Sequence, residues 1–413
     1  MKFNFFLIFF LLMLLNLTAQ QITGIVLDKD TKIEIHGAYI SSINNSFSTK
    51  TDRKGQFTLP NTTVYFFSKE GYITQRVNIT KKKSTIQLIA ISESLNEIII
   101  VSNNFKNKIQ NIPTAISVLT RKDIQRNNVI DMTPILNTIA GVFMHSGTLS
   151  TNRITIRGIG SRSPYNTSKI RAYYQDIPLT NGSGISTIED IDMTTLGKLE
   201  ILKGPSSSIY GAGLGGTLQL IPIKTEFNKS VIESDYTVGS FGLHKYTLKT
   251  AVTNTKNSVN LTYTNLHLDG YRANNKTDRE IITITTNHDI GAKDKISFIG
   301  NLSRVKAFIP SSLNEDDYFE NPAAAAYTWA QSKGFEEYTK GLLGVSWQHE
   351  YNSNTTQKTS VFSSFLNSYE PRPFNILKEE TNGIGIRTRL IQNTTLFKNE
   401  LNWTIGIELF NDA

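Results

Sequence analysis

Apolar and polar residues alternate along the chain from about residue 228 onward, in segments of about ten residues separated by polar turns. Successive side chains of a β-strand point to opposite faces, so the alternation predicts strands with one apolar and one polar face. About nine such segments precede Ala413. The pattern is typical of a barrel whose outer face meets lipid, and it also fits a soluble sandwich with one buried face. The clearest segment, LNWTIGIELF, puts Leu401, Trp403, Ile405, Ile407 and Leu409 on one face and Asn402, Thr404 and Glu408 on the other.

Residues 22–88 show a different pattern, in which short strand-like segments are separated by polar turns. This pattern predicts a small β-sandwich. Asp52–Gly55 is one such turn, because glycine tolerates the positive φ that other residues resist. The segment resembles the carboxypeptidase-regulatory-like domain at Gly24, Val26, Asp28, Gly37, Ala38, Thr49, Thr51, Asp52, Gly55 and Phe57. The six histidines are not spaced for a shared zinc ion, so we expect an interaction or spacer module and no catalytic or metal site.

The N-terminus carries a positive end, an apolar run from Phe3 to Leu15 and a small-residue cleavage site. We interpret residues 1–19 as a secretory signal, with an uncleaved anchor as the alternative. Cysteine is absent, which excludes disulfides and thiolate metal sites. The net charge of +8 is spread widely, with Lys81–Lys83 as the only dense run, so no nucleic-acid partner is expected.

A β-branched run, Leu95–Ser102, follows the sandwich. A buried strand is the simplest reading of this segment alone. The run could instead add itself as a strand to the edge of a partner's sheet, where main-chain hydrogen bonds supply affinity.

The block from Ile112 to Lys224 is a mixture of strands and short helices. A strand over Ala115–Thr120 leads into a helix with Asp123 at its positive end. A short amphipathic helix is expected from Asp131 to Gly141. The later pieces read RITIRGIGSRS, IRAYYQDIPLT and LEILKGPSSSIYGAGLGGTLQLIPIK. In their order along the chain and in their amino-acid sequences, these five motifs resemble the plug domain of TonB-dependent outer-membrane receptors.

The last piece contains a literal G-x-G-x-x-G at Gly211, Gly213 and Gly216. A dinucleotide site needs a strand before these glycines and a helix after them. Here a strand ending at Pro222 follows them, so no nucleotide site is expected. The glycines are expected instead where the last plug strand and its turn press against other backbone.

The resemblance implies a mainly β fold: a small β-sandwich, an α+β plug and the first part of an antiparallel transmembrane barrel of about 22 strands. The chain would then be an N-terminal fragment of a longer receptor. The expected segments are a signal peptide at 1–19, the sandwich at 20–91, a TonB box at 95–103, the plug at 108–225 and barrel strands at 228–413.

By the same resemblance, the protein is a monomeric outer-membrane importer of a scarce ligand such as an iron-siderophore, and it has no cofactor. The sandwich and TonB box would lie in the periplasm. TonB, energised by ExbB and ExbD, would pair with Glu97, Ile98, Ile99, Ile100, Val101 and Ser102. Arg157, Glu200 and Lys203 match plug positions that face the barrel wall, where plug cations meet barrel glutamates. Surface charges at strand ends are an equally plain interpretation of all three.

Ligand contacts are expected at the plug tips, with Arg153, Arg162 and Tyr165 as candidates, because cations and aromatic rings suit anionic chelates. Three alternatives stay open: a glycan importer of the SusC type, a ligand-sensing signal transducer, and a soluble exported enzyme or adhesin. The spelling Leu202-Lys203-Gly204-Pro205 favours an iron-complex receptor over a SusC-type importer, which usually reads LKDASA there.

Overall fold

The structure, a computed structural model, describes residues 21–413. It leaves out residues 30, 31, 44, 45, 61, 62, 70, 71, 91–98, 101–106, 109–113, 129, 162–167, 182, 212, 226–228, 255, 292 and 398. The expected signal peptide and the candidates Glu97, Ile98, Val101, Ser102, Arg162 and Tyr165 therefore lie outside the described residues. Among the helices that are described, none combines the length and the hydrophobicity needed to cross a membrane. The chain divides into two compact units, residues 1–93 and 94–413.

The first unit is a β-sandwich of two four-stranded sheets. Its core consists of apolar side chains from both sheets, such as Val26, Ile40 and Leu88, each fully buried. Gly55 has φ +68°, as its turn requires, and a Cβ there would lie 2.7 Å from the carbonyl oxygen of Val26. One sheet has the order β4 (Gln56–Leu59), β1 (Ile22–Asp28), β8 (Lys83–Ala90), β6 (Tyr72–Ile73); the other has the order β3 (Ser48–Lys50), β2 (Tyr39–Ser42), β5 (Val64–Ser68), β7 (Gln75–Asn78).

The second unit begins with a short two-stranded ladder. β9 (Ile99–Ile100) pairs antiparallel with β10 (Asn107–Lys108). Ile99 and Ile100 are thus extended, as predicted, and their pairing partners lie only a few residues further along the chain.

The block from 114 to 225, called the plug below, is built on a five-stranded sheet. Its order is β11 (Ile116–Thr120), β16 (Leu196–Lys203), β17 (Gly216–Pro222), β14 (Ile170–Tyr174), β15 (Ile177–Pro178). β12 (Val142–Thr148) and β13 (Thr151–Ile156) form a separate hairpin. The helical elements are α2 (Arg121–Arg126), α3 (Thr133–Leu136), η3 (Met193–Thr195) and α4 (Ser207–Tyr210), so the helix expected from Asp131 to Gly141 is only one turn long.

Local sequence explains where α2 begins. The Thr120 side chain accepts a hydrogen bond from the Asp123 backbone N–H, at 3.3 Å, and Asp123 accepts one from the Thr120 N–H, at 2.8 Å. This capping box satisfies two backbone donors that the first turn would leave unpaired. Behind α2 and the sheet, a core that includes Leu136, Ile156, Ile201 and Leu218, all at most 1% exposed, holds the plug together.

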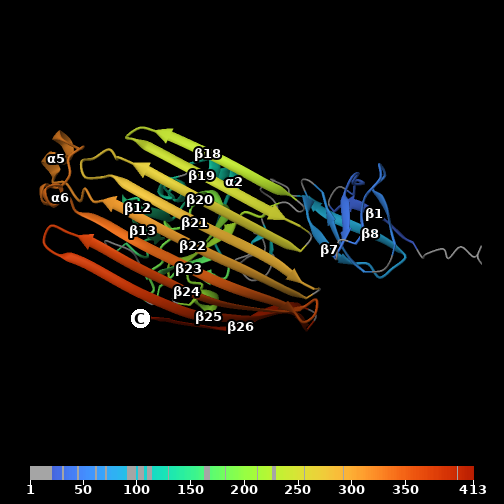
Figure 1. Cartoon of the computed structure of the whole chain (residues 1–413). Helices are drawn as coiled ribbons and strands as arrows, with labels where there is room; N and C mark the ends of the chain where they lie inside the picture. Colours follow the sequence, from blue (N-terminus) through green and yellow to red (C-terminus); the bar gives the residue numbers. More distant parts are fainter. Residues whose placement is uncertain are drawn as a thin grey trace, which may run out of the picture. The chain divides into compact units, whose positions relative to one another are not determined.

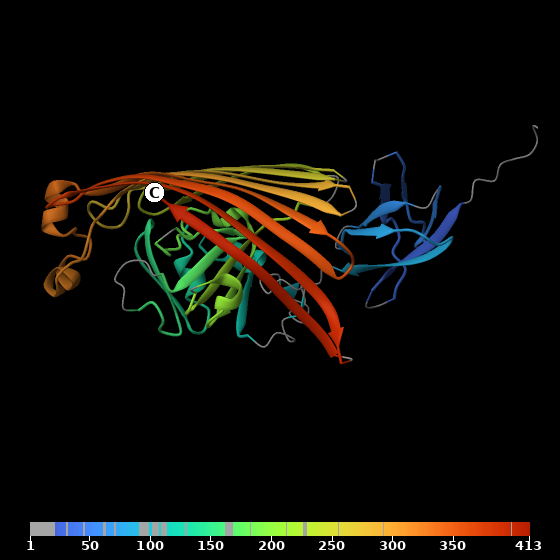
Figure 2. The same cartoon turned by 90° about the horizontal axis from the view of Figure 1, so that it is seen from below.

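Nine antiparallel strands form one continuous sheet, called the wall below. Figure 2 shows this sheet curving around the plug, which lies on its concave face. Figure 1 shows the strands in sequence order, with α5 (Glu315–Glu320) and α6 (Tyr327–Ser332) at one end of the sheet. The strands are β18 (Ser230–Gly239), β19 (Leu243–Thr253), β20 (Asn257–Leu268), β21 (Thr277–Ile290), β22 (Asp294–Phe308), β23 (Phe335–Glu350), β24 (Thr355–Pro371), β25 (Ile376–Leu396) and β26 (Asn399–Asp412).

The wall keeps the predicted alternation. Its convex face is apolar: Leu401, Trp403, Ile405, Ile407 and Leu409 are each 36% to 64% exposed. Its concave face carries polar side chains such as Thr247, Thr264 and Thr283, each at most 3% exposed, and Glu408 reaches a tyrosine of the plug. Three apolar side chains of the wall, Ile299, Leu342 and Phe362, pack into the plug core. The apolar face is therefore the exposed one and the polar face is covered by the plug, whereas a soluble sandwich would bury its apolar face.

The glycine motif closes the plug sheet. At Gly216, φ is +145° and a Cβ would lie 2.2 Å from the Leu202 carbonyl oxygen, so the neighbouring strand leaves no room for a side chain. A Cβ at Gly213 would lie 3.0 Å from the carbonyl oxygen of Gly216 itself. The expectation of close backbone contact is correct at these two positions. Gly211 is different: it has open space around it, and its φ of +68° is what favours glycine there.

Candidate functional site

Carboxylates of the plug pair with cations of the wall at three places. Asp176, which follows β14, pairs with Arg389 of β25 and lies 3.7 Å from Lys358 of β24. Asp190 lies 2.8 Å from Lys340 of β23. Asp192, the N-cap of η3, lies 2.8 Å from Lys245 of β19, and both side chains are at most 2% exposed. The plug is thus the anionic partner and the wall the cationic one.

Burial and charge act in opposite directions on these plug carboxylates. Burial alone would raise the pKa of Asp176, but Arg389, Lys358 and Arg387 outweigh it and hold the pKa well below its usual range. The pKa of Asp192 is also lowered, because Lys245 outweighs the effect of burial. These side chains are therefore ionised at neutral pH, and their attachment to the wall is electrostatic.

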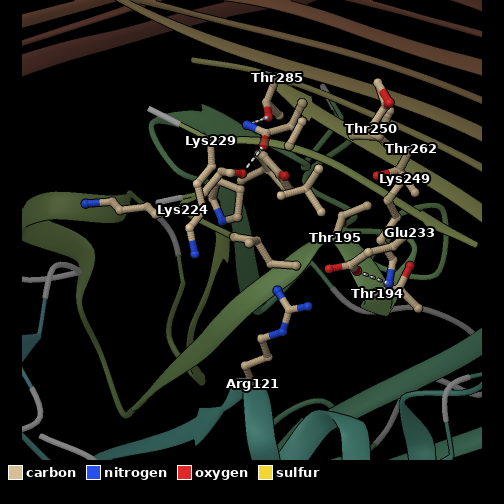
Figure 3. Close-up of a pocket in the computed structure, with 18 residues that line it drawn as sticks. Arg121, Thr194, Thr195, Lys224, Lys229, Glu233, Lys249, Thr250, Thr262 and Thr285 are labelled. Carbon is tan, nitrogen blue, oxygen red and sulfur yellow. Dashed lines mark hydrogen bonds and ion pairs between the residues drawn. The ribbon is translucent and has the colours of Figure 1, made fainter. Parts of the chain in front are cut away.

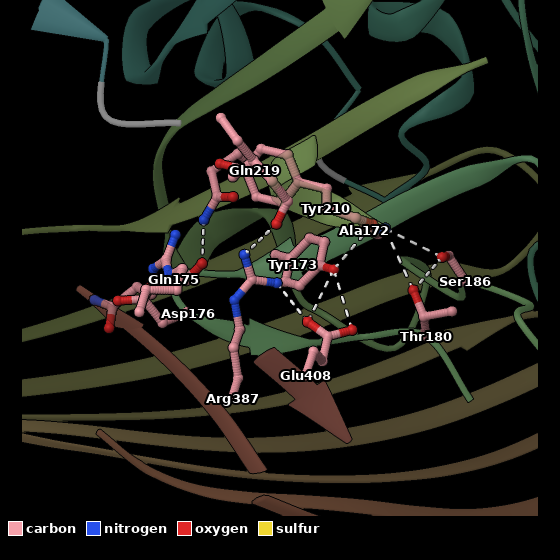
Figure 4. A network of polar contacts seen from close by, with 12 residues as sticks. Ala172, Tyr173, Gln175, Asp176, Thr180, Ser186, Tyr210, Gln219, Arg387 and Glu408 are labelled. Atoms are coloured by element: carbon pink, nitrogen blue, oxygen red, sulfur yellow. Dashed lines mark hydrogen bonds and ion pairs between the residues drawn. The ribbon is translucent and has the colours of Figure 1, made fainter. Parts of the chain in front are cut away.

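Arg387 is the centre of a second attachment (Figure 4). Its guanidinium donates to Glu408 of β26 at 2.5 Å and to the backbone oxygen of Ile209 in the plug at 2.9 Å. The guanidinium carbon lies 4.5 Å from the ring centre of Tyr173 and 5.3 Å from that of Tyr210. Burial raises the pKa of Tyr173 to about 12, so its hydroxyl stays protonated and donates to Glu408 at 3.2 Å. One arginine of the wall thereby holds three plug residues.

A cavity of about 980 Å³ lies between the plug and the strand ends that carry α5 and α6. The β12–β13 hairpin contributes His145 and Arg153, which face each other across the ladder. The wall contributes aromatic side chains, among them Phe362, and the loop between β22 and β23 contributes Trp329. Arg272 ties this loop down, because its guanidinium donates to the backbone oxygens of Ala324, at 2.9 Å, and Ser311, at 2.6 Å. The volume suits a small-molecule ligand.

A smaller cavity of about 280 Å³ lies where the end of the plug meets β18–β21 (Figure 3). Its lining includes several hydroxyl groups, among them those of Thr195, Thr262 and Thr285. Asn260 bridges this region, accepting from Thr225 at 2.5 Å and donating to Thr285 at 3.4 Å. In the part of the chain that the structure describes, no three His, Asp or Glu side chains form a group that could hold a metal ion.

The predicted site residues occupy several places. Arg153 lines the large cavity. Arg157 has φ +51° and its backbone N–H donates to Gly141. Glu200 is fully buried and lies 2.6 Å from Lys198, and Lys203 donates to the backbone oxygen of Ala140 at 3.1 Å. These contacts lie within the plug, and the roles of Arg157, Glu200 and Lys203 at the wall stay predictions.

Sequence reasoning missed the residues that join the plug to the wall: Asp176, Asp190, Asp192, Lys245, Lys340, Arg387, Arg389 and Glu408. One signal was available. Arg387 and Arg389 are two residues apart in a strand, so both point to the polar face that Glu408 also occupies, where a buried charge needs a partner.

Comparison with known proteins agrees with this arrangement. Residues 108–217 match the family model of the TonB-dependent Receptor Plug Domain. The iron-regulated outer membrane virulence protein of Vibrio cholerae serotype O1 is 29% identical over 131 residues, which are 31% of this chain and 20% of that protein. The vitamin B12 transporter BtuB of Photobacterium profundum is 25% identical over 139 residues, or 33% of this chain and 22% of that protein.

Among solved structures, the ferric citrate transporter FecA in its unliganded form superimposes with a TM-score of 0.65 and 15% identity. The superposition covers 77% of this chain and 50% of that one. The shared fold is a plug against barrel strands, which confirms the predicted fold class. The matches span about a fifth of the curated relatives and about half of the solved receptor.

Proposed function

We propose, from the TonB-dependent receptor plug domain that this chain contains, that the protein imports a metal chelate such as an iron-siderophore across the outer membrane. The observation that supports this proposal is that ion pairs attach the plug to the polar face of a sheet whose opposite face is apolar, as a lipid-facing surface would be. A cavity large enough for a small-molecule ligand lies next to this attachment. Apolar side chains of the wall, Ile299, Leu342 and Phe362, also pack into the plug core. Ion pairs and hydroxyl contacts can exchange with water when the plug is moved.

In this proposal the strands cross the outer membrane, with the convex apolar face toward lipid and the large cavity toward the outside. The sandwich and the segment Glu97–Ser102 lie in the periplasm. TonB pairs with that segment as an added strand and transmits the energy supplied through ExbB and ExbD. The extended backbone of Ile99 and Ile100 supports this role, because strand addition needs an extended backbone.

The proposal predicts that a variant can lose uptake of the chelate while it still binds the chelate. Ile99→Pro removes a backbone donor that an added strand needs, so uptake should stop while chelate binding stays unchanged. Ile99→Val keeps the donor and the β-branched shape and should transport normally. Both are measured with a radiolabelled ferric siderophore on cells producing the receptor. Normal uptake by the proline variant would contradict a coupling role for this segment.

The relative BtuB is a vitamin B12 transporter, and we propose that this protein is likewise not an enzyme. The iron-regulated Vibrio cholerae relative supports a metal chelate as the ligand rather than a glycan.

A further inference from the structure

Among the described residues that line the large cavity, carboxylates outnumber cations. Six carboxylates line it against four Lys and Arg side chains. Three of these cations are engaged by the protein. Arg272 donates to loop carbonyls, Lys340 pairs with Asp190, and Arg372 lies 2.6 Å from Glu370.

Three of the carboxylates form no ion pair with a described cation. Among the residues that the structure describes, no Lys, Arg or His nitrogen lies within 4.0 Å of Glu189, Glu336 or Glu379. Glu189 accepts from the backbone N–H of Ile188, at 2.9 Å. Glu336 accepts from the Ser150 hydroxyl of the plug, at 3.1 Å. Glu379 accepts from its neighbour Thr381, at 3.3 Å.

These unpaired carboxylates come from different elements. Glu189 belongs to the plug, Glu336 to β23 and Glu379 to β25, and all three line the same cavity. Half-buried Glu189 and Glu336 are costly to ionise without a partner, and a polyanion would add repulsion to that cost. A cation or a hydrogen-bond donor brought by the ligand would offset it.

We propose that this cavity binds a metal chelate that presents a positive charge, such as a protonated amine, to the wall, and that it rejects polyanionic chelates. The inference rests on the proposed transport function and names its substrate class. It differs from the expectation of an anionic chelate at Arg153, Arg162 and Tyr165, which stays a prediction. Trp329 in the same lining adds an aromatic ring that can attract a cation.

Two siderophores that carry the same iron chelate and differ in one positive charge test this charge preference. Ferrioxamine B carries one protonated amine on its chain, and its N-acetyl derivative keeps the same iron chelate without that charge. We expect the intact receptor to bind ferrioxamine B at least tenfold more tightly than the acetylated form, and ferric citrate more weakly than both. Glu336→Gln and Glu189→Gln should each reduce the ratio, whereas Glu350→Gln, at the other end of β23, should leave it unchanged.

Equal or tighter binding of the acetylated form or of ferric citrate would overturn the inference, and so would no binding of ferrioxamine B. The probe comparison uses the wild-type receptor, so it stays decisive if a variant fails to fold. TonB-dependent uptake of ferric citrate would overturn the charge preference and leave the transport function standing. Uptake that needs no TonB would overturn the transport function while the binding ratio still tests the charge preference.

Discussion

Arg387→Ala removes the guanidinium that joins the plug to β25 and β26. The variant leaves Glu408 without its cation and Tyr173 and Tyr210 without the charge that lies against their rings. It also frees the backbone oxygen of Ile209. The plug should therefore separate from this part of the wall more often than in the wild type.

The magnitude follows from those contacts. A hydrogen bond to a charged group contributes about 1.5 to 3 kcal/mol and a cation–π contact about 0.5 to 2 kcal/mol. Removing one partner of a buried ion pair costs about 3 to 5 kcal/mol in total, a figure that already includes part of those contacts. Glu408 is 32% exposed and can be partly rehydrated, so the lower end, about 3 kcal/mol, is expected. This corresponds to about a 100-fold rise in the population of the detached plug.

The rate of limited proteolysis of the plug in the detergent-solubilised receptor measures the population of the detached plug. This holds because the cleavage rate is proportional to the open population when the plug closes faster than it is cleaved. Arg387→Ala should be cleaved about 100-fold faster than the wild type. Arg387→Lys keeps the charge but loses the planar guanidinium that stacks on the rings, so its cleavage rate should lie between those of the wild type and Arg387→Ala. Arg304→Ala, an exposed position on β22, is the control. Cleavage of Arg387→Ala within threefold of the control, on the order of 0.6 kcal/mol, would refute this anchoring role.

Two further predictions concern the plug. Asp176→Asn should also speed plug cleavage at pH 7. Because the folded state lowers the pKa of Asp176, the stabilisation from its carboxylate is present above its ordinary pKa and is lost as pH falls through the folded value. The cleavage rates of variant and wild type should therefore converge only below about pH 4. Gly216→Ala should destabilise the plug by at least about 3 kcal/mol or block its assembly, as measured by denaturant unfolding, since its Cβ would meet the Leu202 oxygen at 2.2 Å. Gly158→Ala, where φ is also positive but nothing lies within 4 Å, should cost less, and equal costs would contradict the close-contact argument.

The wall was predictable from sequence because alternation fixes which side chains share a face. Leu401, Trp403 and Ile405 lie on the outer face for this reason. The plug strands were predictable from their motifs, whereas the helix after Asp131 was not, since its apolar spacing continues into residues that turn instead.

The partners across the plug–wall interface were not predictable. Arg389 and Asp176 are separated by more than 200 residues, and alternation says which face a charge occupies but not what it meets there. The resemblance suggested plug cations against barrel glutamates. The described ion pairs of Asp176, Asp190 and Asp192 have the opposite polarity, which can be seen only once the wall is placed around the plug.

Energy-dependent transport is tested most directly by comparing binding with accumulation in cells that have or lack TonB. Cells producing the receptor are given radiolabelled ferrioxamine B, and bound and internalised iron are measured separately. We predict equal binding in both strains, with accumulation only where TonB is present and the proton gradient is intact. Equal accumulation without TonB would contradict the proposal that the plug is a TonB-operated gate.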